Sequence, residues 1–124
     1  DGTISFGDYT LDTKTKLDNV EYNGDIYKVK TFKEITKLER NGMFVYESVP
    51  GTSVSHFVET ADGVKFTVEG DEDAQITLEL EEDTEYQVLV NGNSAGKMKT
   101  NLGGKLNISV ELAGFGEVLV EVTR

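Results

Sequence analysis

The chain contains no cysteine and no tryptophan, and it has only one histidine and one proline among its 124 residues. The absence of cysteine excludes disulfides, thiolate metal ligands and cysteine nucleophiles. A single histidine is too few for the clustered ligands of a zinc site. No apolar run approaches the roughly 18–20 residues of a membrane-spanning helix. We therefore expect no cofactor and no membrane partner.

Basic residues are also scarce. The 12 Lys and Arg residues are outnumbered by 23 Asp and Glu residues, which gives a formal net charge of −11 and an isoelectric point near 4.4. This balance argues against a nucleic-acid partner, because phosphate contacts require a basic surface. The length and the 37% hydrophobic content suit one packed core. Residues 1–124 are therefore predicted to form a single domain.

Apolar residues alternate with polar ones through most of the chain. A period of two places one set of side chains on a core and the other in water, as in half-solvated antiparallel strands. The alternating sets are Val64, Phe66 and Val68; Ile76, Leu78 and Leu80; Tyr86, Val88 and Val90; Leu106, Ile108, Val110 and Leu112; and Val118, Val120 and Val122. Residues Thr31–Leu38 offer a helical turn as an alternative, although their threonines favour a strand.

Turn signals separate these runs at intervals of about eight to twelve residues. Asn-Gly and Asp-Gly pairs are the strongest short hairpin signal. Four of them are present, at Asn23-Gly24, Asn41-Gly42, Asp62-Gly63 and Asn91-Gly92. Pro50-Gly51 suits the centre of a type II turn. The spacing predicts an all-β fold: a single antiparallel β-sandwich, jelly-roll or immunoglobulin-like, with about ten or more strands.

The few basic residues gather in two stretches, since ten of the twelve lie within residues 13–40 or 86–110. Each stretch contains two lysines spaced two apart, so each pair points to one face of its strand. We predict that these lysines, with one more from the second stretch, converge on one surface and bind a ligand. The predicted ligand-binding residues are Lys28, Lys30, Lys97, Lys99 and Lys105.

A basic patch on an acidic protein suits a soluble polyanion of modest charge density. A polysaccharide of uronic acids fits this description, because its spaced carboxylates pair with lysine ammonium groups. The alternative interpretation is that these lysines are solvated side chains that discourage aggregation between sheets.

The acidic residues are concentrated as well: residues 59–85 carry eleven of them and a single base. Oxygen-rich turns of this kind hold calcium in some proteins. The spacing lacks the alternating ligands, central glycine and distal glutamate of an EF-hand. We predict a solvated acidic surface with no metal, and structural calcium remains the alternative.

Catalytic constellations are weak in this chain. His56 follows Ser53 and Ser55, but a base so near in sequence on one strand cannot readily reach its nucleophile, and the glycine-flanked elbow is missing. Carboxylate pairs suited to glycoside hydrolysis are expected by chance among 23 acidic residues. We predict no catalytic residue and no enzymatic activity.

Two stretches are similar to secreted bacterial β-sandwich modules. Residues 44–57 read FVYESVPGTSVSHF. Residues 86–105 read YQVLVNGNSAGKMKTNLGGK, with a strand, an Asn-Gly turn, a small-residue loop and a Thr-Asn pair before the next strand. With residues 24–40, they resemble non-catalytic carbohydrate-binding modules of polysaccharide-degrading enzymes from anaerobic gut and rumen bacteria, and most closely the pectin-binding modules of pectate lyases.

This resemblance implies a secreted β-sandwich that binds homogalacturonan through basic side chains instead of an aromatic platform. It also implies covalently attached catalytic or scaffold modules that the domain directs to the plant cell wall. A chain without tryptophan is compatible with such a ligand, since ion pairs and hydrogen bonds replace stacking on a charged sugar. The alternative function is a structural or adhesive spacer domain of a cell-surface protein, with no affinity for glycans.

Overall fold

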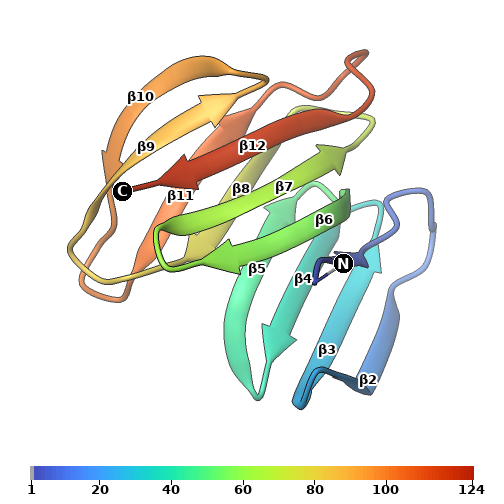
Figure 1. Cartoon of the computed structure of the whole chain (residues 1–124). Coiled ribbons are helices and arrows are strands. Elements are labelled where there is room, and N and C mark those ends of the chain that lie inside the picture. Colours follow the sequence, from blue (N-terminus) through green and yellow to red (C-terminus); the bar gives the residue numbers. More distant parts are fainter. Residues whose placement is uncertain (1) are drawn as a thin grey trace.

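Figure 1 shows the computed structural model of the protein, which describes residues 2–124 as two stacked antiparallel sheets. The strands are β1 (Ile4–Phe6), β2 (Thr15–Tyr22), β3 (Asp25–Phe32), β4 (Ile35–Arg40), β5 (Met43–Val49), β6 (Ser53–Thr60), β7 (Gly63–Glu69), β8 (Ala74–Glu79), β9 (Glu85–Val90), β10 (Asn93–Lys99), β11 (Lys105–Val110) and β12 (Val118–Thr123). Sheet A has the order β1-β6-β7-β12-β9-β10, and sheet B has the order β11-β8-β5-β4-β3-β2. The predicted antiparallel β-sandwich is confirmed.

The described residues contain no helix, and therefore none that is long and apolar enough to cross a membrane. The segment Thr31–Leu38, for which a helical turn was the alternative, contains the end of β3, a two-residue turn and most of β4. Phe32 is paired with Ile35 and Thr31 with Thr36 across this hairpin. On β4 the core-facing residues are Thr36 and Leu38, and Ile35 faces outward opposite Phe32.

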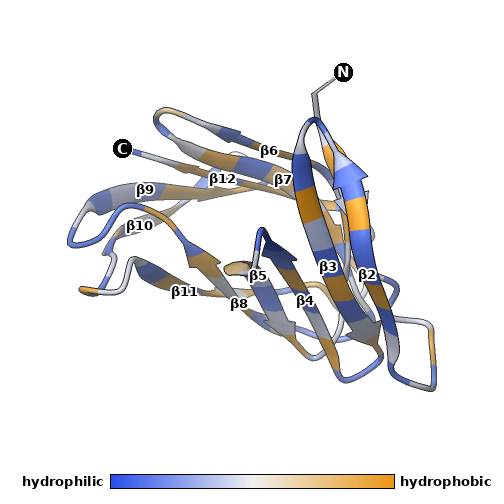
Figure 2. Ribbon diagram, turned by 90° about the horizontal axis from the view of Figure 1, so that it is seen from below, coloured by the Kyte–Doolittle hydropathy of each residue, from blue (hydrophilic) through white to orange (hydrophobic). Residues whose placement is uncertain are grey.

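The inner faces of the two sheets form one hydrophobic core, and the alternation that predicts it is visible along the strands in Figure 2. The predicted alternating residues are buried there, except Leu80 and Val90, which are half-buried. Aromatic rings fill the part of the core between β1 of sheet A and β5 of sheet B. The Tyr46 ring meets those of Phe6 and Phe66 edge to face, with centroids 5.2 and 5.7 Å apart, a preferred geometry for aromatic pairs.

The Asn-Gly turns have the predicted conformation. In all three pairs both residues have positive φ, between 49° and 52° for asparagine and between 80° and 83° for glycine, as a type I′ hairpin turn requires. The prediction of a type II turn at Pro50-Gly51 is wrong, because Gly51 lacks the positive φ that this turn requires at its second central residue. Glycine is required at residue 51 for another reason: a Cβ there would lie 2.0 Å from the carbonyl oxygen of Phe32.

Four consecutive strands, β2 to β5, form a meander in sheet B, and after β7 the chain crosses repeatedly between the sheets. In Figure 2, β3 and β2 turn up from the plane of the other sheet B strands and close one side of the sandwich. A β-bulge interrupts β2 between Leu17 and Val20, where Asn19 has a φ of 57°. A bulge inserts one extra residue into a strand and shifts by one the pairing of the residues on its far side. The bulge therefore determines which residue of β3 lies opposite each residue of β2.

Candidate functional site

Three lysines lie side by side on the outer face of sheet B. Lys16 of β2 is directly opposite Lys30 of β3, and Lys30 is directly opposite Lys37 of β4. Neighbouring strands are about 4.8 Å apart, so the row extends about 10 Å across the strands. Lys28 points to the same face, because it lies two residues before Lys30 on β3. We call Lys16, Lys28, Lys30 and Lys37 the lysine cluster.

The charges of the lysine cluster are not neutralised by ion pairs. Among the residues that the structure describes, no carboxylate oxygen lies within 4.0 Å of a cluster ammonium nitrogen. The four lysines line a hollow of about 240 Å³ together with Glu39, which lies opposite Lys28. Four positive charges and one negative charge thus surround the hollow. Across the strands Lys28 is opposite Glu39, and Lys37 is opposite Glu47 of β5 as well as Lys30. Lys30 alone has a lysine opposite it on both sides, and like charges directly opposite each other destabilise a sheet.

A buried network of hydroxyl groups lies on the other side of the same strands. Thr31 follows Lys30, Thr36 precedes Lys37, and their hydroxyl oxygens are 2.8 Å apart. The Thr36 hydroxyl donates to the carbonyl oxygen of Thr52 at 2.8 Å and accepts from its N–H at 3.0 Å. Within residues 2–124 no buried side-chain polar atom lacks a hydrogen-bond partner. A fully satisfied polar network rigidifies its surroundings, and here it holds β3 and β4 in the register that aligns the lysines.

The hydroxyls of Thr52, Ser48 and Tyr46 complete this network. Ser48 and Tyr46 on β5 each place a hydroxyl oxygen 2.8 Å from that of Thr52. Burial raises the pKa of the Tyr46 hydroxyl well above its ordinary value, although hydrogen bonds from Thr52 and Ser48 act in the opposite direction. Tyr46 is therefore neutral at physiological pH and links the row beneath the lysine cluster to the aromatic core.

Phe44 of β5 extends this surface towards the far edge of sheet B. The ammonium nitrogen of Lys105 lies 4.6 Å from the centroid of the Phe44 ring, and that of Lys37 lies 6.0 Å from it. Both distances are within the range of cation–π attraction. Lys105 also forms an ion pair with Glu79, the residue opposite it on β8. Lys105 is thus on the same face as the lysine cluster, but its charge already has a partner.

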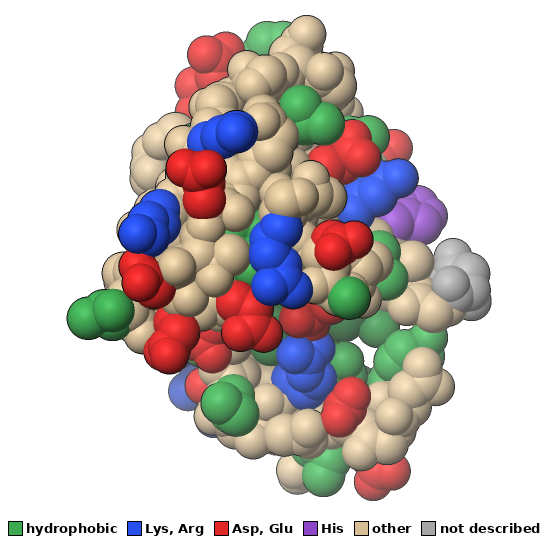
Figure 3. All heavy atoms as spheres, turned by 60° about the vertical axis from the view of Figure 1, so that its left-hand side comes forward, with side chains coloured by type: hydrophobic (Ala, Val, Ile, Leu, Met, Phe, Trp, Pro, Cys, Tyr) green, Lys and Arg blue, Asp and Glu red, His purple; other side chains and the backbone are tan. Residues whose placement is uncertain are grey.

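Lys97 and Lys99 lie on the opposite side of the sandwich. They are on β10, at the edge of sheet A, where they are opposite Gln87 and Glu85. The ammonium nitrogen of Lys99 is 3.2 Å from a carboxylate oxygen of Asp83. On this side of the molecule basic side chains are interspersed with acidic ones, as Figure 3 shows.

The prediction that Lys28, Lys30, Lys97, Lys99 and Lys105 converge on one surface is therefore wrong. Lys28 and Lys30 are together, and Lys105 is farther along the same face. The chain crosses from sheet A to sheet B between β10 and β11, and this crossing separates Lys97 and Lys99 from the others. Whether any of these lysines binds a ligand stays a prediction.

Sequence reasoning missed Lys16 and Lys37. Both are in the basic stretch of residues 13–40, so the charge count contained a signal. Lys37 is found by counting outward from the Lys33-Glu34 turn, which pairs it with Lys30. Lys16 is not found in this way: counting from the Asn23-Gly24 turn would pair it with Thr31, and only the bulge places it opposite Lys30.

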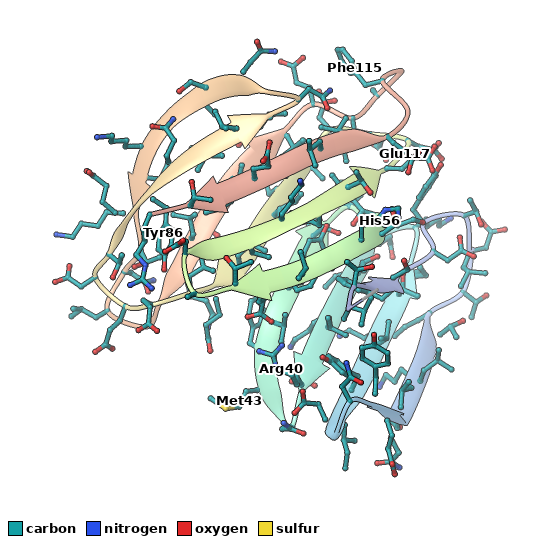
Figure 4. All side chains as sticks on the ribbon, in the orientation of Figure 1. Arg40, Met43, His56, Tyr86, Phe115 and Glu117 are labelled. Atoms are coloured by element: carbon teal, nitrogen blue, oxygen red, sulfur yellow. The ribbon has the colours of Figure 1, made fainter. Side chains whose placement is uncertain are left out.

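The residues weighed for catalysis are apart from the lysine cluster. His56 lies in a bulge of β6 with a φ of 55° and is exposed (Figure 4). The hydroxyls of Ser55 and Thr67 form a hydrogen bond with each other. The structure therefore assigns this segment no nucleophile that is hydrogen-bonded to the histidine.

A second cavity, of about 360 Å³, opens between the sheets at the end where Arg40, Met43 and Tyr86 lie (Figure 4). Its cations are already bound within the protein. Arg40 forms an ion pair with Glu59, and this contact is the main cause of the raised pKa of the guanidinium. Arg124 donates to the carbonyl oxygen of Ala61. The cavity thus has fewer unpaired positive charges for an anionic ligand than the lysine cluster has.

The acidic segments have structural partners. A carboxylate oxygen of Asp73 accepts the N–H groups of Leu112 and Ala113 at 2.9 and 3.2 Å, and so ties the loop after β11 to the start of β8. Within residues 2–124 no group of three or more His, Asp or Glu side chains is arranged to hold a metal ion. The calcium alternative therefore has no defined site in this part of the chain.

Comparison of the chain with protein-family models, with curated proteins and with solved structures found no match. The resemblance to pectin-binding modules thus stays a prediction, and the functional argument depends on the geometry of the lysine cluster.

Proposed function

We propose that the protein is a non-catalytic binding module for an acidic polysaccharide, and that the lysine cluster is its binding surface. The observation that carries the proposal is the row Lys16, Lys30 and Lys37, which places like charges opposite each other on three adjacent strands. Glu47 of β5 lies opposite Lys37 at the end of the row, but no ion pair joins the two side chains. Such a row costs stability in the free protein. A bound polyanion would offset this cost.

The geometry suits a linear polymer that crosses the strands. The row repeats at the strand spacing of about 4.8 Å, and Lys28 widens it along β3. A chain of uronic acids carries its carboxylates at regular intervals and has a lower charge density than a nucleic acid. Its lower charge density means that a protein with a net charge of −11 repels it less strongly. Salt further weakens this repulsion, because charges farther away than about 8 Å are screened.

Lysine chemistry supports the same ligand class. Ammonium groups are flexible point charges that adapt to carboxylates in several positions, whereas arginine favours planar, bidentate recognition. The partly exposed Phe44 ring continues the surface towards Lys105 and offers a sugar an apolar contact. In keeping with the resemblance, the preferred ligand is homogalacturonan of low ester content. The module would be secreted and would direct an attached enzyme to the plant cell wall.

The test is calorimetry of the wild type and of Lys30→Ala/Lys37→Ala on low-ester pectin. Each exposed lysine–carboxylate contact contributes roughly 0.2–1 kcal/mol, so the double variant is expected to bind about tenfold more weakly or not measurably. Highly methyl-esterified pectin and a neutral glucan are expected to bind less well than low-ester pectin. Added salt should weaken binding to the acidic polymer.

The matched control is Lys97→Ala/Lys99→Ala, which removes two lysines spaced two apart from the opposite side of the sandwich. It is expected to bind like the wild type. Equal losses in the two double variants would indicate attraction by overall charge and would contradict a site at the lysine cluster. A wild type that binds none of the polysaccharides would favour the alternative, a structural or adhesive spacer domain.

A further inference from the structure

Strand β2 is a long, open edge of sheet B. All eight of its residues are exposed, and its one hydrogen-bonded neighbour among the described strands is β3. It is the outermost strand of sheet B in Figure 1. The edge of sheet A on the same side, β1, has only three residues. An exposed edge presents unpaired N–H and C=O groups that can pair with another strand.

This edge also exposes apolar side chains. Leu17, Val20 and Tyr22 are 56%, 42% and 37% exposed. Leu17 is opposite Val29 and Val20 is opposite Tyr27, and both of these β3 residues are buried in the core. Paired residues on neighbouring strands point to the same side, so Leu17 and Val20 point to the inner side of the sheet. The bulge makes this possible, because without it residues three apart would point to opposite sides.

We propose that β2 pairs in antiparallel fashion with β2 of a second copy of this chain, so that two copies of sheet B form one continuous sheet. The sequence of β2 is complementary to itself about a two-fold axis between Asp18 and Asn19. In this register Lys16 faces Glu21 of the other copy and Leu17 faces Val20. Thr15 faces Tyr22, so all eight residues have a partner, and each contact occurs twice.

Charge complementarity is the argument for a second copy as the occupant. Opposite charges directly across an antiparallel pair stabilise it, and like charges destabilise it. The pairing gives Lys16 an acidic neighbour, which it lacks within its own chain, where it faces Lys30. Leu17 and Val20 would cover each other on the inner side. The bulges of the two copies would lie opposite each other, so the spacing from Leu17 to Val20 is matched in both strands.

The pairing has a consequence for the lysine cluster. A two-fold axis perpendicular to the sheet keeps both outer faces on the same side, so two clusters would form one surface of eight lysines. The dimer itself does not depend on the proposed function. If both hold, one long polyanion engages both copies and its binding gains from the higher effective concentration of the second site.

The test is analytical ultracentrifugation of the protein alone, from micromolar to millimolar concentration and without any glycan. A concentration-dependent dimer is expected. Lys16→Glu and Glu21→Lys, made singly, each replace two attractive contacts by two repulsive ones, and each is expected to weaken the dimer about tenfold or more. The double variant Lys16→Glu/Glu21→Lys restores opposite charges and is expected to recover the dimer to within a few fold of the wild type.

The control is Lys97→Glu, the same charge change on the exposed edge strand β10, which should leave the dimer unchanged. Circular dichroism verifies that each variant is folded. A wild type that stays monomeric up to millimolar concentration would overturn the proposal. So would single variants that associate like the wild type, or a double variant that fails to recover. None of these results bears on whether the monomer binds pectin.

Discussion

Two hairpins of this sandwich carry lysines with the same local spacing and place them in different electrical surroundings. On β3, Lys28 and Lys30 are two apart, and on β10, Lys97 and Lys99 are two apart. Lys30 has a lysine opposite it on each side. Lys97 faces Gln87, and Lys99 faces Glu85 and is paired with Asp83.

The difference shows that cross-strand neighbours, and not spacing along the chain, decide whether lysines form a site. Lys30 lies between two lysines, whereas Lys28 faces Glu39 and Lys99 faces Glu85 and is paired with Asp83. Each hairpin is also supported by a buried threonine. Thr36 holds the loop at Thr52 beneath the lysine cluster, and Thr100 holds the turn before β9. The surface lysines and the buried threonines of the two hairpins can both be compared by substitution.

The largest effect is expected from the buried threonines. Thr36→Val leaves the N–H and carbonyl groups of Thr52 without their side-chain partner and is expected to lower the free energy of unfolding by about 2–3 kcal/mol. Thr100 donates to the carbonyl oxygen of Glu81 and accepts the N–H of Thr84, at the margin of the fold. Thr100→Val should therefore cost less, about 1–2 kcal/mol. Urea unfolding measures both, and an equal or reversed order would contradict the central role of the Thr36 network.

The second effect is a loss of stability at high pH on the lysine-cluster side. Burial raises the pKa of folded Tyr46, whereas a tyrosine in the unfolded chain titrates near its ordinary value of 10.0. Below pH 10 both states are protonated and this residue adds no pH dependence. Above it only the unfolded chain loses the proton, so stability should fall by up to about 1.4 kcal/mol per pH unit. Urea unfolding of the wild type and of Tyr46→Phe at pH 8 and 11 isolates this contribution. An equal loss of unfolding free energy between the two pH values in both proteins would contradict it.

The third effect sharpens the comparison between the lysines themselves. Lys30→Glu places a carboxylate between Lys16 and Lys37, so two repulsive neighbours become attractive. The free energy of unfolding should rise by about 0.5–1 kcal/mol, while pectin binding should be lost. Lys97→Glu, opposite a neutral glutamine, should leave stability within about 0.5 kcal/mol of the wild type. Thermal unfolding of both variants at low salt is the measurement, and no gain for Lys30→Glu would show that the row carries no electrostatic strain.

The smallest effect is expected for the ion pair on the β10 side. Lys99 and Asp83 are 62% and 61% exposed, and exposed pairs contribute little because water and salt screen them. Lys99→Ala should therefore change the free energy of unfolding by less than about 0.5 kcal/mol. Lys105→Ala should cost more, because this less exposed lysine contacts both Glu79 and the ring of Phe44. Chemical denaturation of both variants in low and high salt measures these losses. A larger loss of stability for Lys99→Ala than for Lys105→Ala would contradict the expected order.

Sequence alone determined much of this protein, because the relevant signals are local. The period-two alternation between Val64 and Val122 identified the core faces of β7, β8, β9, β11 and β12, though not of β10. The pairs Asn23-Gly24, Asn41-Gly42 and Asn91-Gly92 identified hairpins. Both depend on the backbone conformation of a few neighbouring residues. The pairing of Lys30 with Lys37 is local in the same sense, since a two-residue turn joins their strands, and it could have been counted from the sequence.

The tertiary structure decided the rest, because it depends on contacts between distant residues. The bulge at Asp18-Asn19 carries no clear sequence signal, yet it aligns Lys16 with Lys30 and places Leu17 and Val20 on one side. Lys99 and Lys105 are six residues apart, but the chain changes sheet between them and they lie on opposite faces of the sandwich. The order of strands in a sheet follows from burying all apolar faces together, and no local pattern specifies which strand becomes an edge.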